Sequence, residues 1–349
     1  MLEMAPQGLY CDLGDFYIDP SRAVEHALIT HAHSDHARKG SKNYWCVESS
    51  TALVLTRLGR VNRLTAVKYG QKIKFGKVWV SFHPAGHILG SAQIRIESEN
   101  EVWAVSGDFK RGPDPSCEEF EVIPCDTWIT EATFGLPVYQ WPPITDAIQE
   151  IYAWWMANRA EGRASLLYAY SLGKTQRVLT ELFKLFPSLC EKVYLHPAAV
   201  ELTECYRRSG ILMLATRSLA DCLETESLAG QMIIAPSSSS MKDWINRLGS
   251  YEEAFASGWM LLKKARFGRG LDRGFVVSDH ADFSDLVQTA CETGAKQVYV
   301  MYGDHRALAR QLEKRGIRTG PVTDLKPGAK SHRREKAEAP QGPVQLSLF

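Results

Sequence analysis

The feature that most constrains this chain of 349 residues is the run His31-Ala32-His33-Ser34-Asp35-His36. The run directly follows an apolar segment, Ala27–Thr30, whose pattern indicates a short strand. We therefore expect the run on the loop after that strand. Four side chains able to bind a cation stand within six residues. Such a cluster repels itself or needs partners unless a cation is present. Because zinc accepts imidazole nitrogen and carboxylate oxygen, the run predicts a zinc-type site.

Two further motifs add ligand-type residues at the ends of predicted strands. His87 stands on a Gly-rich turn, residues 84–92, after a strand at 78–82, and Asp108 follows a strand at 102–105 in Ser106-Gly107-Asp108. Alone, each motif is an ordinary turn, and a lone histidine is more often a capping or core residue. Together with the run they supply another imidazole and another carboxylate.

The hydrophobic pattern divides the chain into blocks. Residues 9–110 read as short strands separated by turns, with another strand at 127–130. From Asp146 the apolar period becomes helical and continues to Gly162. Strands at 166–170, 192–195 and 232–235 then alternate with helices at 173–186 and 200–209, and strands at 275–277 and 298–301 are each followed by a helix. This alternation predicts an α/β unit in the middle of the chain.

Composition limits the function classes only weakly. The net charge is +1, so a nucleic-acid partner cannot be argued from global charge. No apolar stretch reaches ~18 residues, so no membrane span is expected. The eight cysteines match no disulfide framework or zinc ribbon, and no signal peptide is visible, which favours a cytoplasmic location.

The motif series resembles the metallo-β-lactamase superfamily, and the string Gly86-His87-Ile88-Leu89-Gly90-Ser91-Ala92 resembles its β-CASP branch, which processes nucleic acids. The resemblance implies an α/β fold, an αββα sandwich with an inserted β-CASP α/β domain. The expected parts are 1–140 and 272–325 for the metallo-β-lactamase domain, 141–271 for the insert, and 326–349 for a disordered tail.

The same resemblance implies two zinc ions, with Mn²⁺ as an alternative at the second site. In this pattern His31, His33 and His87 bind the first metal, Asp35 and His36 bind the second, and Asp108 binds both. Asp19 orients the loop that carries residues 31–36, called the metal loop below. Glu131, at the end of the 127–130 strand, and His280, in Ser278-Asp279-His280-Ala281-Asp282, match two more β-CASP motifs. Their implied roles are a phosphate contact and general acid for His280, oriented by Glu131; imidazole suits proton donation near neutral pH.

One motif departs from the family pattern. Tyr302 stands where the family often has a histidine that ligates the second metal, and His305 lies three residues further on, at the expected start of a helix. Two alternatives stay open. Either His305 reaches the metal, or the second site has one protein ligand fewer.

Several basic residues are candidates for substrate binding. Ser171 and Lys174 lie in a string that resembles one in the β-CASP insert and opens a helix, whose N-terminus can bind phosphate. The alternative is an ordinary helix cap with a solvated lysine. Lys264, Arg266 and Arg269 belong to a basic segment that could hold a phosphodiester backbone without reading its sequence, or form a solvated loop.

The last residues form a separate motif. Residues 326–343 are charged and rich in Pro, Gly and Ala, a composition typical of a disordered linker. They lead to Gln345, Leu346, Leu348 and Phe349 in the string QLSLF, which resembles the peptide that docks bacterial replication and repair proteins on the DNA sliding clamp. The alternative is a tail that folds back on the body of the protein.

Within the β-CASP branch, the chain most resembles the bacterial DNA-ligase-associated exonuclease group, also described as messenger-RNA 3′-end-processing-like. This implies a zinc-dependent DNA exonuclease acting in repair, with 3′ to 5′ polarity favoured and DNA, the clamp and DNA ligase as partners. The alternatives are a β-CASP ribonuclease, a small-ester or thioester hydrolase, and a non-catalytic nucleic-acid-binding scaffold, for which Tyr302 is the one supporting feature.

Overall fold

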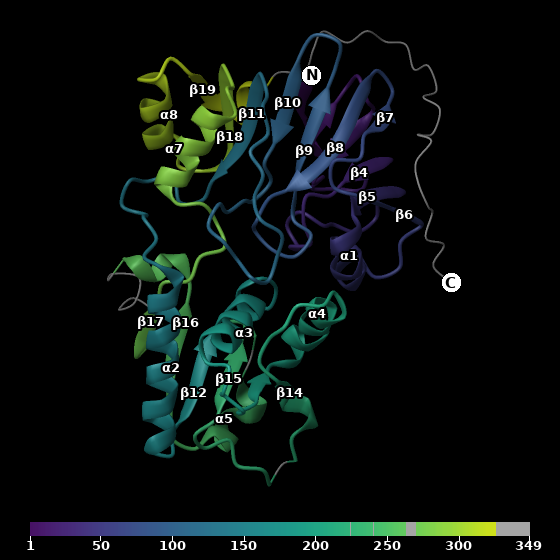
Figure 1. The fold of residues 1–349 in the computed structure, drawn as a ribbon. Helices are drawn as coiled ribbons and strands as arrows, with labels where there is room; N and C mark the ends of the chain where they lie inside the picture. The colour runs from purple at the N-terminus through teal and green to yellow at the C-terminus, as the bar shows by residue number, and fades with distance from the viewer. Residues whose placement is uncertain (224, 240, 263–269, 326–349) are drawn as a thin grey trace. The chain divides into compact units, whose positions relative to one another are not determined.

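The computed structural model describes residues 1–223, 225–239, 241–262 and 270–325. The chain forms two compact units (Figure 1). The first consists of Met1–Pro113, Cys117–Val138 and the segment from His280 onward; the second consists of Asp114–Ser116 and Tyr139–Asp279. Each unit is a mixed arrangement of helices and sheets, so the α/β class expected from the sequence is confirmed.

The first sheet of the first unit has its strands in sequence order. They are β1 (Leu2–Ala5), β2 (Gly8–Cys11), β3 (Phe16–Ile18), β4 (His26–Leu28), β5 (Asn43–Val47) and β6 (Arg63–Val67). β1 to β3 pair antiparallel, and β3 to β6 pair parallel. Helix α1 (Thr51–Leu58) connects β5 to β6. The run of ligand-type side chains, residues 31–36, begins three residues after β4.

The second sheet of the first unit has seven strands in the order β19-β18-β11-β10-β9-β8-β7. In chain order they are β7 (Ile73–Phe75), β8 (Val78–Pro84), β9 (Ala92–Glu97), β10 (Val102–Val105), β11 (Thr127–Ala132), β18 (Gln297–Gly303) and β19 (Arg318–Pro321). β10, β11, β18 and β19 are parallel. The carboxyl ends of these strands therefore lie along one edge, where Asp108, Glu131 and Tyr302 are found.

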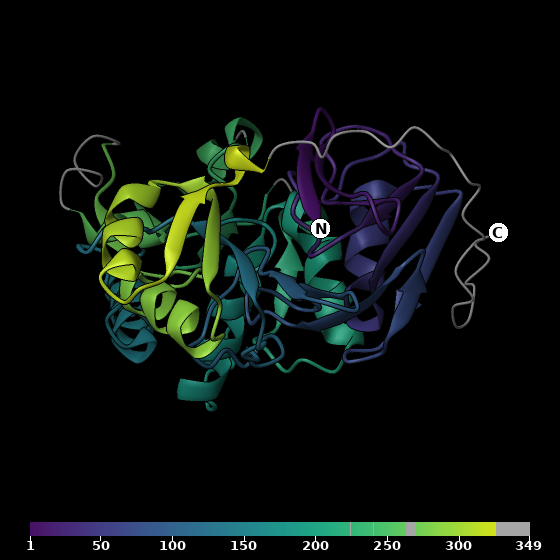
Figure 2. The same ribbon diagram turned by 90° about the horizontal axis from the view of Figure 1, so that it is seen from above.

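Both faces of this second sheet are buried. Ile129 of β11 packs in a cluster that also contains Phe16 of the first sheet, whereas its neighbour Trp128 faces a cluster shared with Leu286 of α7 (Phe283–Glu292) and Leu308 of α8 (His305–Glu313). Figures 1 and 2 show α7 and α8 beside β18 and β19. Burial on both faces explains why β10, Val102–Val105, is continuously apolar.

The second unit contains a six-stranded parallel sheet in the order β14-β13-β15-β12-β16-β17. In chain order the strands are β12 (Ala164–Tyr168), β13 (Val193–Leu195), β14 (Thr216–Ser218), β15 (Met232–Ala235), β16 (Tyr251–Ala256) and β17 (Arg273–Phe275). The helices are α2 (Ile144–Ala160), α3 (Lys174–Leu185), α4 (Pro197–Arg208) and α5 (Lys242–Leu248). Parallel strands need crossover connections, and these helices provide most of them.

The predicted end of the insert at residue 271 differs from the structure. β17 pairs with β16, so the chain remains in the second unit until Asp279. Asp114–Ser116 also belongs to the second unit, which no local pattern had indicated. No helix in the described part of the chain is both long enough and apolar enough to cross a membrane.

Candidate metal centre and active site

Three imidazole rings and one carboxylate converge at the edge of the first unit. The Nε2 atoms of His31 and His87 lie 3.0 and 3.1 Å from Nδ1 of His33. One ligand atom from each of these three residues and one from Asp108 all lie within 4.8 Å of one another. His31, His87 and Asp108 are buried, and His33 is half-buried. Segments far apart in sequence thus deliver four donor atoms to one point.

The donor set fits a cation better than it fits a hydrogen-bond network. Nδ1 of His33 faces two other ring nitrogens, and one nitrogen cannot satisfy both neighbours with a single proton. Ring nitrogens that bind zinc at ~2.0–2.1 Å in a tetrahedral arrangement stand about 3.3 Å apart, close to the separations found here. Burial and the neighbouring histidines hold the pKa of His31 well below its usual value, so this ring is neutral, the form that binds metals.

A second group of ligand-type atoms shares Asp108 with the first. Oδ2 of Asp108 lies 3.6 Å from Nε2 of His31 and 3.7 Å from Nε2 of His36. Nε2 of His36 in turn lies 3.7 Å from Oδ2 of Asp35, whose side chain is 71% exposed. The Asp108 carboxylate therefore faces both groups. The second group contains a single imidazole and an exposed carboxylate, so it is the poorer of the two in nitrogen donors.

The charges around His36 also favour a cation. Burial alone would lower the pKa of His36, but the carboxylates of Asp108 and Asp19 outweigh burial and raise it to about 10. Burial and the nearby Glu131 carboxylate raise the pKa of Asp108 to about 6. In both cases neighbouring carboxylates favour the protonated form, so the negative charge gathered here stabilises positive charge.

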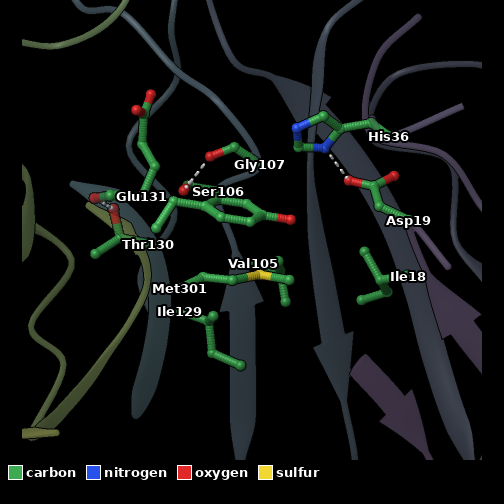
Figure 3. A pocket seen from close by; sticks show the side chains of 11 residues that line it. Ile18, Asp19, His36, Val105, Ser106, Gly107, Ile129, Thr130, Glu131 and Met301 are labelled. Carbon is green, nitrogen blue, oxygen red and sulfur yellow. Dashed lines mark hydrogen bonds and ion pairs between the residues drawn. The ribbon is translucent and has the colours of Figure 1, made fainter. Parts of the chain in front are cut away.

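Asp19, the residue directly after β3, contacts the metal loop and the residue before it. Its carboxylate accepts hydrogen bonds from the Thr30 backbone N–H at 2.8 Å and from the Thr30 hydroxyl at 2.5 Å. The carboxylate also lies 2.7 Å from Nδ1 of His36 (Figure 3). Oγ1 of Thr30 lies 3.0 Å from Nδ1 of His31. Asp19 thus holds His36 directly and His31 through Thr30, leaving Nε2 of each ring directed at the cluster. The sequence did not single out Thr30; the only signal was a hydroxyl residue directly before His31.

The turn that carries Asp108 is packed tightly against the same loop. Gly107 has φ of +57°, and a Cβ atom there would lie 2.8 Å from Cβ of Thr30. Only glycine combines this backbone conformation with such a close approach. The short turn after β10 therefore brings Asp108 to the histidines.

His280 and Glu131 form a pair beside the first group. Nδ1 of His280 lies 2.9 Å from both carboxylate oxygens of Glu131, which is 2% exposed. The Phe109 N–H and the Thr133 hydroxyl also donate to Glu131. The His280 and His87 rings are 4.8 Å apart between centroids. Glu131 therefore fixes the orientation of His280 next to the metal-type cluster.

Tyr302 and His305 have different surroundings. Tyr302 pairs with Glu131 across β18 and β11, and its ring centroid is 5.8 Å from that of His36. His305 is the first residue of α8, which Asp304 caps. Within the described residues, no group of three or more metal-type ligands contains His305. The role of His305 as a metal ligand stays a prediction. Tyr302, which stands where the family often has a histidine, lies with its ring beside that of His36.

A small pocket adjoins His36 and Tyr302 (Figure 3). Its walls come from β3, β10, β11, β18 and the metal loop. Its lining residues are Ile18, Asp19, His36, Val105, Ser106, Gly107, Ile129, Thr130, Glu131, Met301 and Tyr302. In Figure 3 the apolar side chains of Ile18, Val105, Ile129 and Met301 lie below, and the polar side chains of His36, Asp19 and Glu131 lie above them.

The residues expected to bind substrate are only partly visible. Ser171 is half-buried just before α3. Lys174 is 4% exposed and forms an ion pair with Asp279, so its ammonium group already has a partner inside the second unit. A phosphate contact by Lys174 stays a prediction. Lys264, Arg266 and Arg269, and the tail residues Gln345, Leu346, Leu348 and Phe349, lie outside the described residues.

The chain is similar in sequence to known proteins that are named as nucleic-acid enzymes. No family model matches the chain. The chain is 29% identical over 312 residues, 89% of its length, to a probable DNA ligase of Opitutus terrae, and 22% identical over 195 residues, 49% of its length, to an RNase J-like protein of Methanocaldococcus jannaschii. It spans 30% of the first protein and 46% of the second.

A solved structure shares the fold. The crystal structure of a protein of unknown function from Enterococcus faecalis superposes with a TM-score of 0.55, covering 84% of this chain and 78% of that one at 13% identity. At this identity the likeness concerns the fold alone. Together, the motif series and the relatives above support a metallo-β-lactamase β-CASP family for this chain.

Proposed function

We propose that this protein is a metal-dependent nuclease, a DNA exonuclease acting in repair, built as an αββα sandwich with a β-CASP insert. The observation that carries the proposal is the His280–Glu131 pair beside a cluster of three histidines and Asp108, all within one unit. A simple esterase needs the cluster but has no evident use for a second, oriented proton donor. The name of one relative, an RNase J-like protein, also points to a nuclease.

The two groups of ligand atoms suggest how the metals would be held. His31, His33, His87 and Asp108 would bind the first ion, for which zinc is the fitting choice. Asp108, His36 and Asp35 would bind the second, where Mn²⁺ is an alternative because carboxylates contribute more of the ligands. When bound, such a pair activates water and neutralises charge that develops on the phosphoryl group.

His280 is the proposed proton donor. Its Nδ1–H donates to the Glu131 carboxylate, which leaves Nε2 as the nitrogen that gives a proton to the departing oxygen of the nucleotide. Glu131 is held by donors from Phe109 and Thr133, so it keeps the ring in one orientation and stabilises the imidazolium form. Asp19 acts one step further away, by holding His36 and Thr30.

DNA is the proposed substrate, and DNA ligase and the sliding clamp are the proposed partners. The probable DNA ligase of Opitutus terrae contains a segment similar to most of this chain, which supports a role next to ligation. The QLSLF tail supports clamp docking, because Leu and Phe can fill an apolar pocket while a linker raises the local concentration of the enzyme. Deleting residues 345–349 should abolish clamp binding and leave activity on free oligonucleotides unchanged; unaltered clamp binding would remove this part of the proposal.

A ribonuclease is the second candidate, because the Methanocaldococcus jannaschii relative is named RNase J-like. The deciding experiment is digestion of DNA and RNA of matched sequence, each labelled at either the 5′ or the 3′ end, by zinc- or manganese-reconstituted protein. Stepwise shortening of DNA from the 3′ end, with slower loss of RNA, is the expected result. Faster loss of RNA would favour the ribonuclease, internal cuts would rule out an exonuclease, and loss of neither would favour a scaffold.

A further inference from the structure

Helix α3 in the second unit carries two buried cations in its first turns. Lys174 is 4% exposed and Arg177 is 3% exposed. A buried charge is unfavourable unless it is paired, and replacing a buried ion pair by apolar residues is often neutral or stabilising. Stability alone therefore gives little reason to bury two cations on one helix, which suggests that the contacts of Lys174 and Arg177 serve another role.

The partners belong to the segment that ends the second unit. Lys174 donates to Asp279, which is 2% exposed. Arg177 donates from its guanidinium to the backbone carbonyl of Ser278 at 2.5 Å. Its Nε also lies 3.1 Å from Oδ2 of Asp114, which belongs to the short stretch where the chain first enters this unit.

These contacts hold the backbone immediately before His280. β17 ends at Phe275, so residues 276–279 have no strand pairing of their own. On the other side of His280, the Ala281 N–H donates to the Phe109 carbonyl at 2.7 Å. His280 thus follows directly after two residues that are fixed to α3.

We propose that Lys174 and Arg177 are positioning residues for His280: they fix residues 278–279 so that the imidazole meets Glu131 in the orientation needed for proton transfer. This inference rests on the proposed role of His280. A misplacement of about 1 Å in a reacting group can cost about 100-fold in rate. Lys174 then acts through the backbone and not by touching the phosphate.

The test compares three variants at Lys174 with a matched control. Lys174→Met removes the ion pair, and Lys174→Arg keeps it. Lys174→Met combined with Asp279→Asn removes the pair without leaving a buried charge unpaired. Lys184→Met replaces an exposed lysine near the end of the same helix. Circular dichroism and thermal unfolding report whether each variant folds.

The expected kinetic result is a fall in kcat of about 10- to 100-fold for Lys174→Met and for the double variant, with KM for DNA nearly unchanged. Lys174→Arg and Lys184→Met should stay within a few-fold of the parent protein. A rise in KM with unchanged kcat would overturn the proposal in favour of a direct phosphate contact. Recovery of kcat in the double variant would also overturn it, because the damage would then come only from the unpaired charge.

A second readout does not need nuclease activity, so it separates this inference from the proposed function. The Nδ1 proton that His280 shares with Glu131 can be followed by NMR in ¹⁵N-histidine-labelled protein and assigned by its loss in His280→Gln. Lys174→Met should shift or broaden this resonance, and Lys174→Arg should preserve it. An unchanged resonance in folded Lys174→Met would refute the positioning role whatever the enzyme hydrolyses.

Discussion

Replacing Asp19 with alanine should loosen the second cation far more than the first. The change removes the carboxylate that lies 2.7 Å from Nδ1 of His36 and accepts two hydrogen bonds from Thr30. The second group has His36 as its single imidazole, so it depends fully on the orientation of that ring. The first group loses only indirect support for His31, through Thr30, and keeps His33 and His87.

The expected loss of metal affinity can be estimated from the role of Asp19, which orients a ligand without binding the metal itself. Loss of a residue that orients a metal ligand typically weakens affinity 10- to 100-fold, about 1.4–2.8 kcal/mol. We expect a loss of this size at the second site and a smaller one at the first. Calorimetric titration of metal-stripped protein with zinc, with a competing chelator for the tighter site, measures both. The matched control is Asp12→Ala, which replaces an exposed aspartate in the same unit.

Two outcomes would contradict this reasoning. Equal weakening of both sites would mean that Asp19 supports the loop as a whole and not His36 in particular. Unchanged affinity at the second site would mean that His36 is not a ligand there, or that its orientation is fixed by other contacts.

Titration of the parent protein with zinc should show one tight and one weaker site, and Tyr302→His should tighten the weaker one; equal affinities in the parent would contradict the unequal donor sets. Gly107→Ala should lower both thermal stability and metal affinity because its Cβ would lie 2.8 Å from Thr30, whereas Gly162→Ala, at a similar positive φ but with no atom within 4 Å, should cost only the backbone strain of about 1–2 kcal/mol and leave metal affinity unchanged. Trp128→Ala should lower the free energy of unfolding by about 3–5 kcal/mol, measured by denaturant titration, because this side chain is fully buried between the second sheet and α7; a loss below about 1 kcal/mol would contradict that packing.

Strands buried on both faces were the easiest elements to predict. The expected strands at 102–105 and 232–235 coincide with β10 and β15, because continuous apolar runs bounded by polar residues leave little doubt about their ends. The strand expected at 166–170 is β12 at Ala164–Tyr168. Its apolar run continues past the point where pairing stops, and Tyr170 is 51% exposed. Strand ends are set by partners far away in sequence, which a local pattern does not contain.

Long-range pairing also explains the shifted domain boundary. The apolar residues near Phe275 indicated a strand, but nothing local said which sheet it would join, and it joins β16 of the second unit. The ligand-type residues of the site were visible from their spacing and from the resemblance to a family. What the sequence could not give is how Thr30 links Asp19 to His31, or that Lys174 is turned inward to Asp279. Both facts depend on side-chain contacts between segments.

In the proposed function, the histidine and aspartate cluster makes this chain a phosphodiester hydrolase. The most direct test is the hydrolysis rate of end-labelled DNA by zinc-reconstituted His33→Ala, compared with the parent protein and with His26→Gln, a histidine on the first sheet outside the cluster. We expect His33→Ala to lose more than about 100-fold in rate, together with tight binding of one zinc ion, while His26→Gln behaves like the parent. Full activity in His33→Ala under the same metal conditions would show that this cluster is not the catalytic centre.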